Sequence, residues 1–153
     1  MARTVKELLA AKTGDVLTIG PEATVYDAIA MMAREQVGAL VVTEKERVTG
    51  ILTERDYARK VVLENRSSRS TRVCEIMTDR VIYVRPEQPI EECMALMTDK
   101  RVRHLPVLDG DSLLGMISIG DVVKDVISEK EFMIDQLTRY ISGHWASVKS
   151  AQP

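Results

Sequence analysis

The chain has 153 residues, the size of one ordinary domain, and 45% hydrophobic with 29% charged side chains supply enough apolar material for a core. Its 21 basic and 23 acidic residues nearly cancel, and 4% aromatic residues are too few for base-stacking platforms, so we expect no nucleic-acid partner. The apolar runs are too short to span a membrane, and two cysteines outside any metal-ligand pattern are typical of a reducing compartment. We therefore expect a cytoplasmic protein with no membrane partner.

The apolar pattern predicts two units of strand, helix, strand, strand and helix. In the first unit a short strand ends at a Pro-Glu turn, and Val25, Ala28, Ile29 and Met32 follow at helical spacing. The predicted strands of this unit are 16–19, 39–43 and 48–52, and its second helix is 55–63. The second unit repeats the order with strands at 81–84, 104–108 and 113–117, a helix beginning at Ile90 and another at 120–128.

The two units are copies of one repeat. Residues 16–61 and 81–126 align without a gap and share eleven identical positions. A prelude recurs as well, with Val5-Lys6-Glu7-Leu8-Leu9 matching Val73-Cys74-Glu75-Ile76-Met77. One copy alone would bury a marginal core, so two should share one. We predict an α/β (α+β) fold in which two tandem β-α-β-β-α repeats pack sheet to sheet with pseudo-two-fold symmetry.

The expected domain organisation follows from the repeat and from composition. Repeat 1 spans 3–64, a linker rich in serine and arginine spans 65–72, and repeat 2 spans 73–130. A C-terminal helix and tail occupy 131–153. The apolar stripe of that helix includes Phe132, Leu137, Tyr140 and Ile141, and the residues from Ser147 onward are expected to fray.

A motif marks the end of the third strand in each copy. Gly50-Ile51-Leu52-Thr53-Glu54-Arg55-Asp56 and Gly115-Met116-Ile117-Ser118-Ile119-Gly120-Asp121 share the pattern Gly-h-h-[Ser/Thr]-x-x-Asp, where h is apolar. Together with Arg103-His104-Leu105-Pro106-Val107 and the prelude, these motifs resemble the cystathionine-β-synthase (CBS) domain family. The resemblance covers roughly residues 3 to 130, and the chain looks most like the small stand-alone members whose two copies form one Bateman module.

The resemblance implies a non-catalytic regulatory module that binds adenosine-containing nucleotides between the copies. AMP is the expected ligand, with ADP, ATP or NAD as alternatives. The motif Asp would hold the ribose hydroxyls and the Ser or Thr would contact phosphate. One expected site combines Thr53, Asp56, Ile82, Val102, Arg103 and His104. Its twin combines Ser118, Asp121, Leu17, Val37, Gly38 and Ala39. Since Gly38 and Ala39 stand where the other site has Arg103 and His104, the two sites should prefer different ligands.

The chemistry of the motif supports this interpretation and also an alternative. A helix N-terminus presents unpaired N–H groups that suit phosphate, and a carboxylate accepts two hydrogen bonds from vicinal hydroxyls. However, Thr-x-x-Asp or Ser-x-x-Asp before an apolar helix is also close to a capping box, which stabilises the helix start without any ligand. The two roles are compatible with each other.

Other candidate groups are weaker. The linker residues Arg66, Ser67, Ser68 and Arg69 could clamp phosphates, because guanidinium groups bind phosphate in a bidentate manner, or they could only solvate the linker. Neither histidine has a partner at metal-ligand spacing, so no metal is predicted. No catalytic triad or glycine-rich phosphate loop occurs, so we do not expect an enzyme.

The expected partners are a regulated protein that the sequence does not identify and a second copy of the chain. Apolar residues of the second helices exceed one stripe, as at Val61, Val62 and Leu63, which is typical of an interface. The terminal helix could add to such a homodimer or fold back within a monomer. The alternative function is a dimeric interaction scaffold that needs no ligand.

Overall fold

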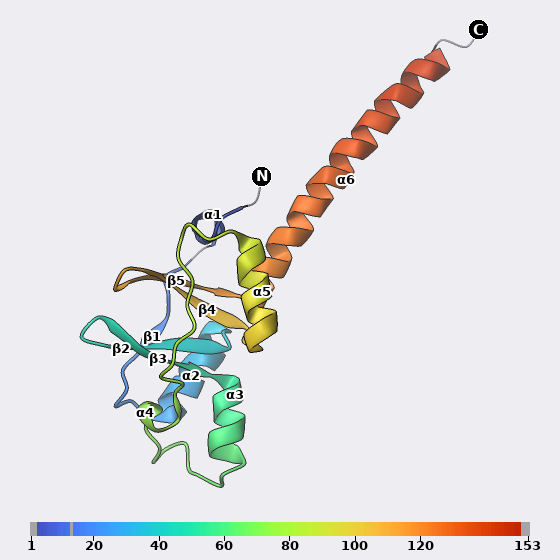
Figure 1. The fold of residues 1–153 in the computed structure, drawn as a ribbon. Coiled ribbons are helices and arrows are strands. Elements are labelled where there is room, and N and C mark those ends of the chain that lie inside the picture. The colour runs from blue at the N-terminus through green and yellow to red at the C-terminus, as the bar shows by residue number, and fades with distance from the viewer. Residues whose placement is uncertain (1–2, 13, 151–153) are drawn as a thin grey trace.

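The computed structural model describes residues 3–12 and 14–150, with side chains as far as residue 142. The first half holds α1 (Val5–Ala11), β1 (Thr18–Ile19), α2 (Val25–Glu35), β2 (Ala39–Glu44), β3 (Arg47–Thr53), α3 (Glu54–Tyr57) and the π-helical turn η1 (Ala58–Val62). The second half holds α4 (Val73–Ile76), α5 (Ile90–Lys100), β4 (His104–Asp109), β5 (Ser112–Ser118) and α6 (Ile119–Ser150) (Figure 1).

The strands form two small sheets with matching register. In the first, β2 is central, parallel to β1 and antiparallel to β3. In the second, β4 is antiparallel to β5. Leu40 lies opposite Leu52 in the first sheet, and the equivalent Leu105 lies opposite Ile117 in the second. The sheets lie one above the other with β3 beside β5 (Figure 1). The predicted α/β fold of two tandem repeats is confirmed.

The predicted strand at 81–84 was wrong, and Pro106 explains why. In repeat 1 the N–H of Val41 donates to the carbonyl of Leu17 over 3.2 Å, which joins β2 to the segment of β1. Pro106 occupies the equivalent position in β4 and has no N–H to donate. Val84 alone forms a parallel bridge, to Val107. The segment before it therefore runs beside the sheet without becoming a regular strand.

The helices differ from prediction at their ends. The predicted helix at 55–63 divides into α3 and the π-helical turn η1. The helix predicted at 120–128 does not end before a separate terminal helix, because α6 continues for 32 residues to Ser150. Glu129, Lys130 and Glu131 are good helix formers, and no proline interrupts the segment. The residues from Ser147 onward were expected to fray, but α6 continues as a helix to Ser150. Residues 151–153 lie outside the described residues. Within the described residues, no helix has both the length and the apolar composition to cross a bilayer.

Each repeat completes its core with the helix that precedes the other repeat. Val5 and Leu8 of α1 pack in the core of the second repeat, with Leu105. Val73 and Ile76 of α4 pack in the core of the first. Backbone hydrogen bonds fix this exchange: Val5 donates to Gln88 over 2.9 Å, and Val73 donates to Ala23 over 2.8 Å. The exchange was not expected from the sequence, and we expect it to make the two repeats depend on each other for stability.

The linker is mostly exposed, as expected, but several contacts hold it. Thr71 is 2% exposed. The N–H of Tyr26 donates to the carbonyl of Ser68 over 3.0 Å, and the guanidinium of Arg69 lies 4.0 Å from the centre of the Tyr26 ring. Arg66 pairs with Glu75 over 2.7 Å. A backbone hydrogen bond from Arg72 and the side-chain bond from Arg66 hold the pKa of Glu75 below its usual range. The linker is therefore anchored to α2 and α4.

Candidate functional site

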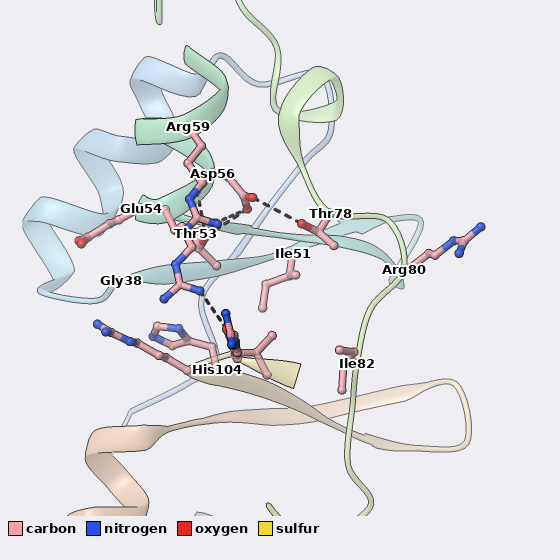
Figure 2. Close-up of a pocket in the computed structure, with 14 residues that line it drawn as sticks. Gly38, Ile51, Thr53, Glu54, Asp56, Arg59, Thr78, Arg80, Ile82 and His104 are labelled. Carbon is pink, nitrogen blue, oxygen red and sulfur yellow. Dashed lines mark hydrogen bonds between the residues drawn. The ribbon is translucent and has the colours of Figure 1, made fainter. Parts of the chain in front are cut away.

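A cavity of about 360 Å³ lies between the two repeats, and residues of both line it (Figure 2). All six residues expected for the first site line this cavity: Thr53, Asp56, Ile82, Val102, Arg103 and His104. Gly38, expected for the twin, also lies here, where a Cβ atom would come within 3.4 Å of Cε1 of His104. The structure thus brings together the set of residues that the sequence predicted for the first site.

Several lining residues were missed at the sequence level. They are Ile51, Glu54, Arg55, Thr78, Arg80 and Arg101. Arg59, which the sequence alone leaves either at this site or facing solvent, lines the cavity too. Thr78 and Arg80 follow α4, which packs on the first repeat, so their presence depends on the helix exchange. Arg101 ends α5 in the left-handed conformation with φ 54, as Gln36 does at the end of α2 with φ 55. Ile51, Glu54 and Arg55 lie inside the Gly-h-h-[Ser/Thr]-x-x-Asp motif, but only its Thr and Asp were expected to contact a ligand, and the motif gave no signal for Thr78, Arg80 and Arg101. The arginine content of the segments on either side of it was the available hint.

The cavity is strongly positive. Five arginines line it against the carboxylates of Glu54 and Asp56: Arg55, Arg59, Arg80, Arg101 and Arg103. The guanidinium of Arg55 donates to the carbonyl of Arg101 over 2.9 Å. Among the described residues, no carboxylate lies within ion-pairing distance of these five guanidinium groups. Such a surplus of guanidinium favours a ligand with several negative charges.

His104 lies at the floor of the cavity beside Arg103. Burial first, and then the positive charges of Lys12 and Arg103, hold the pKa of His104 below its usual range, although Asp121 opposes them. The imidazole is therefore mainly neutral at pH 7, with one nitrogen that donates and one that accepts. A phosphate placed beside it would favour the protonated ring.

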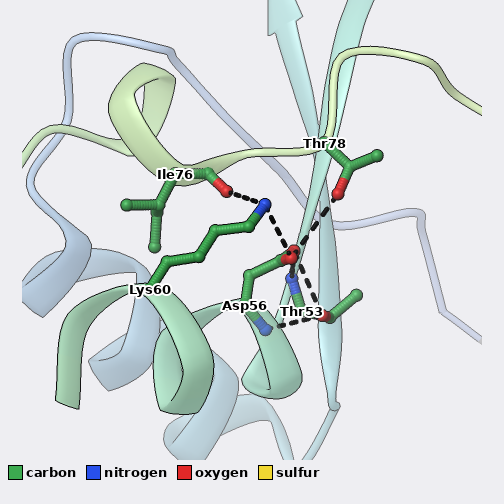
Figure 3. A network of polar contacts seen from close by, with 5 residues as sticks. All are labelled: Thr53, Asp56, Lys60, Ile76 and Thr78. Atoms are coloured by element: carbon green, nitrogen blue, oxygen red, sulfur yellow. Dashed lines mark hydrogen bonds and ion pairs between the residues drawn. The ribbon is translucent and has the colours of Figure 1, made fainter. Parts of the chain in front are cut away.

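The Asp56 carboxylate is the centre of a polar network at the start of α3 (Figure 3). Its Oδ2 accepts from the N–H of Thr53 over 3.0 Å and from the Thr53 hydroxyl over 3.1 Å. The N–H of Asp56 donates to Thr53 Oγ1 over 3.1 Å, which completes a capping box. Asp56 Oδ1 lies 3.2 Å from Lys60 Nζ and 3.5 Å from the Thr78 hydroxyl. The capping interpretation is thus correct for the local structure, and Oδ1 holds the longer contacts that a ligand could replace.

The twin site has the same cap but a different neighbour. Asp121 Oδ2 accepts from the N–H of Ser118 over 2.8 Å, and the N–H of Asp121 donates to Ser118 Oγ over 3.1 Å. Lys12 Nζ donates to Asp121 over 2.9 Å and to the Met116 carbonyl over 2.8 Å. Burial raises the pKa of Asp121, but the hydrogen bonds from Lys12 and Ser118 outweigh it and hold that pKa below its usual range. Lys12 stands at the prelude position of Arg80, so the two sites differ in which cation holds the motif Asp: Lys12 lies 2.9 Å from Asp121, whereas Lys60 lies 3.2 Å from Asp56.

The other residues expected for the twin do not line the described cavity. Leu17 and Val37 pack against the core of the first repeat, and Ala39 is fully buried at the start of β2. The linker residues expected to bind phosphate, Arg66, Ser67, Ser68 and Arg69, are also absent from the lining. Arg66 and Arg69 are engaged with Glu75 and Tyr26 instead. Their binding of phosphate stays a prediction.

Metal ligands are not assembled in the described part of the chain. No three His, Cys, Asp or Glu side chains there come together as metal ligands would. Cys93 is buried, and burial, with the charges of Glu92 and Glu91, raises the pKa of its thiol to about 11. That thiol is therefore protonated and packs as a small apolar side chain.

Known proteins resemble this chain over most of its length. A curated relative, the mitochondrial CBS domain-containing protein CBSX3 of Arabidopsis thaliana, is 47% identical over 125 residues, which cover 78% of this chain and 61% of the relative. This chain thus spans about three fifths of that protein. A solved structure of a protein with CBS domains from Burkholderia ambifaria is 55% identical, with a TM-score of 0.79 over 82% of this chain and 95% of that chain.

A more distant structure shares the fold. The CBS domain pair of protein MJ0100, solved with 5′-methylthioadenosine and S-adenosyl-L-methionine, is 20% identical, with a TM-score of 0.75 over 84% of this chain and 99% of that chain. The family model of the CBS domain matches residues 5–63 and 73–128 of this chain. The two matched segments contain both copies of the Gly-h-h-[Ser/Thr]-x-x-Asp motif. The chain therefore belongs to the CBS domain family and contains a tandem pair of CBS domains.

Proposed function

We propose that this chain is a regulatory module that binds an adenosine nucleotide in the cavity between its two repeats. AMP is the expected ligand, and ADP, ATP and NAD are the alternatives. The observation that carries the proposal is the convergence of Asp56 and five arginines on one cavity of about 360 Å³. That volume lies within the range of about 300 to 1,000 Å³ typical of small-molecule sites. The adenosyl compounds bound by MJ0100 support the choice of ligand class.

The lining residues suit the three parts of a nucleotide. Asp56 Oδ1 accepts hydrogen bonds at the helix start, where the ribose hydroxyls would replace or join Thr78. Ile82 and Val102 offer an apolar wall for the adenine ring. The guanidinium groups supply bidentate donors for phosphate. We assign Ile51 to the same apolar wall.

The first site should bind more tightly than its twin. A nucleotide at the twin would have to displace Lys12 from Asp121, whose ammonium lies 2.9 Å from the carboxylate. In the first site the equivalent Arg80 lines the cavity, and a nucleotide would compete with Lys60 and Thr78, which lie farther from Asp56 Oδ1, at 3.2 and 3.5 Å. The expected difference in preference between the sites thus has a physical cause at Lys12 as well as at Arg103 and His104.

Signalling would follow from a shift between arrangements of the two repeats. Lys60 Nζ bridges Asp56 and the carbonyl of Ile76, the last residue of α4. Thr78, two residues later, contacts the same carboxylate. A ligand at Asp56 therefore acts on the segment that joins the repeats, and its effect is limited by its different affinity for the two arrangements. A partner protein would bind the two arrangements with different affinity. We propose that the module has no catalytic step. We also propose that it is located in the cytoplasm.

The first test is thermal unfolding with candidate nucleotides. A ligand that binds only the folded chain adds about 2.7 kcal/mol at 100 times its Kd. For a chain of this size the melting temperature should rise by roughly 5–10 °C. The measurement compares AMP, ADP, ATP and NAD on protein that mass spectrometry has shown to be free of nucleotide. A melting temperature that stays constant with all four at millimolar concentration contradicts the proposal.

The second candidate function is a scaffold that needs no ligand. Its support is that Thr53 and Ser118 cap their helices with Asp56 and Asp121 as the structure stands. Under this interpretation the motif is retained for helix stability alone. Constant melting temperatures in the experiment above would favour it.

Replacing Arg103 with alanine tests the phosphate role of the positive cavity. The change should weaken ATP binding by roughly tenfold or more, since a hydrogen bond to a charged group contributes about 1.5–3 kcal/mol. Adenosine, which has no phosphate, should lose little. The difference should also shrink as salt is raised from 50 to 500 mM, because salt screens an exposed charge. Isothermal titration of both ligands measures it, and an equal loss for adenosine and ATP contradicts the phosphate role.

A further inference from the structure

A second hollow opens beside the cavity between the repeats, where α5 ends and α6 begins. Its volume is about 260 Å³, and it is more open to solvent than the first cavity. We call it the outer hollow. Four residues line both the cavity and the outer hollow: Arg55, Arg101, Val102 and Arg103. The two spaces are therefore neighbours, and the three shared arginines form a wall that belongs to both.

Hydrogen bonds hold this arginine wall in place. Arg55 belongs to the first repeat, and its guanidinium donates to the carbonyl of Arg101 in the second over 2.9 Å. Arg101 itself ends α5 in the left-handed conformation. The N–H of Ile119 donates to the carbonyl of Arg103 over 2.8 Å, which ties the start of α6 to the same wall. The wall thus presents guanidinium groups from both repeats, and such groups bind the oxygens of linked phosphates in a bidentate manner.

The floor of the outer hollow is apolar. Met97 and Val102 contribute to it from the end of α5, and Ile119, which is 45% exposed, contributes from α6. The Thr98 hydroxyl donates to the carbonyl of Met94 over 2.9 Å, so its oxygen keeps lone pairs that can accept from a ligand hydroxyl. A terminal phosphate gains nothing from an apolar floor, whereas a flat ring gains by burying its face. The outer hollow therefore suits a second nucleoside better than a longer chain of phosphates.

The internal repeat provides a comparison for this wall. In the gapless alignment, the counterparts of Arg55, Arg101, Arg103 and Ile119 are, in that order, Gly120, Gln36, Gly38 and Glu54. The twin site thus has neither the guanidinium groups nor the apolar side chain. Since strands, helix starts and capping motif recur in both copies, the fold itself does not require the wall. Its presence on one side only indicates a role in binding.

We propose that the first site binds a dinucleotide. The adenosine half lies in the cavity between the repeats, the phosphates lie on the arginine wall, and the second nucleoside lies in the outer hollow. This inference rests on the proposed function, because the adenosine half takes the place assigned there to a mononucleotide. Among the adenosine ligands named above, it favours the dinucleotide over AMP.

Charge also distinguishes between two forms of the second ring. Three arginines line the outer hollow, and among the described residues that line it there is no carboxylate. A cationic ring is repelled in such surroundings, whereas a neutral ring is not. NAD carries a cationic nicotinamide ring, and NADH carries a neutral dihydronicotinamide ring. The site should therefore bind NADH more tightly than NAD, by roughly threefold or more at low salt.

The first experiment is isothermal titration of the ligand-free chain with NADH, NAD and ADP-ribose. ADP-ribose has the phosphates and both riboses of NADH but lacks the second ring. NADH should bind roughly tenfold more tightly than ADP-ribose, because its ring buries apolar surface in the outer hollow. Equal affinities for NADH and ADP-ribose overturn the proposal. NADH that binds no more tightly than NAD overturns the preference for a neutral ring.

Replacing Ile119 with serine tests the outer hollow. This variant should bind NADH about fivefold more weakly and ADP-ribose within about twofold of the wild type, since only the ring rests on Ile119. Leu114→Ser is the matched control. Leu114 is 47% exposed in β5 and lines neither space, so its replacement should leave both affinities unchanged. An equal loss for NADH and ADP-ribose in Ile119→Ser contradicts the placement of the second nucleoside.

Replacing Arg101 with glutamine tests the arginine wall. Gln36 has φ 55 at the equivalent position and Arg101 has φ 54, so the variant should keep the backbone conformation. NADH and ADP-ribose should both lose about tenfold in affinity, whereas adenosine should lose little. An Arg101→Gln variant that binds ADP-ribose as the wild type does contradicts the position of the phosphates.

The effect of AMP on the melting temperature separates this proposal from the one on which it rests. A melting temperature that rises with AMP, together with equal affinities for NADH and ADP-ribose, contradicts the dinucleotide alone. A melting temperature that neither AMP nor NADH raises contradicts both proposals.

Discussion

Replacing Asp56 with asparagine is expected to lower nucleotide affinity about tenfold to a hundredfold while lowering the stability of the ligand-free chain only slightly. Asparagine retains one side-chain oxygen, so it can still accept from the N–H of Thr53, the bond that measures 3.0 Å with Asp56. It loses the charge that attracts Lys60 and that accepts strongly from ribose hydroxyls, which is a loss of about 1.5–3 kcal/mol in binding. Isothermal titration gives the affinity, and urea unfolding gives the stability.

The matched control is Asp121→Asn, which makes the same change at the same helix position of the other repeat. Because Asp121 does not line the cavity of the first site, we expect this variant to leave affinity at that site within about twofold. Equal losses of stability in both variants with unchanged affinity in both would mean that the two carboxylates act only as helix caps. A larger affinity loss in Asp121→Asn would place the principal site in the twin.

The repeat made much of the fold and one site predictable from the sequence. Gapless alignment of two copies gave the order of strands and helices, since residues with the same role recur at the same offset. The shared motif then located Thr53 and Asp56 at a strand-to-helix junction, where the structure has a capping box. The residues predicted opposite them, such as Ile82 and His104, line the same cavity. Local patterns and an internal comparison were enough for these features.

The features that were missed depend on contacts between segments far apart in the sequence. An apolar stripe on α4 shows that the helix is buried, but nothing in the stripe says against which repeat, so Thr78 and Arg80 were not expected at the site. Lys12 was missed for the same reason, since its bond to Asp121 depends on where α1 packs. Pro106 was visible in the sequence. Its effect on the segment 81–84 follows only once the structure shows which residue would have accepted a hydrogen bond from the N–H that proline lacks.

Replacing Ile76 with alanine is expected to destabilise the whole chain by about 2–5 kcal/mol, although Ile76 precedes the second repeat and completes the core of the first. The side chain is 2% exposed, so its removal leaves a cavity. Total stability of a domain is about 5–15 kcal/mol, and the melting temperature should fall by roughly 5–20 °C. Thermal unfolding followed by circular dichroism measures the change. Leu63→Ala, at a side chain that is 77% exposed, should change stability by less than about 0.5 kcal/mol.

Leu8 stands at the same prelude position in α1 and is 6% exposed in the core of the second repeat. Leu8→Ala should therefore destabilise the chain to a similar extent, and each variant should unfold in a single transition because each repeat holds a helix of the other.

The Ile76→Ala and Leu8→Ala variants should differ in nucleotide binding. Ile76→Ala disturbs the segment whose carbonyl accepts from Lys60 over 2.9 Å and which leads to Thr78, so it should also weaken nucleotide affinity. Leu8→Ala has no such connection to Asp56. Two separate transitions, or an Ile76→Ala variant as stable as Leu63→Ala, would show that the exchanged helices do not couple the repeats.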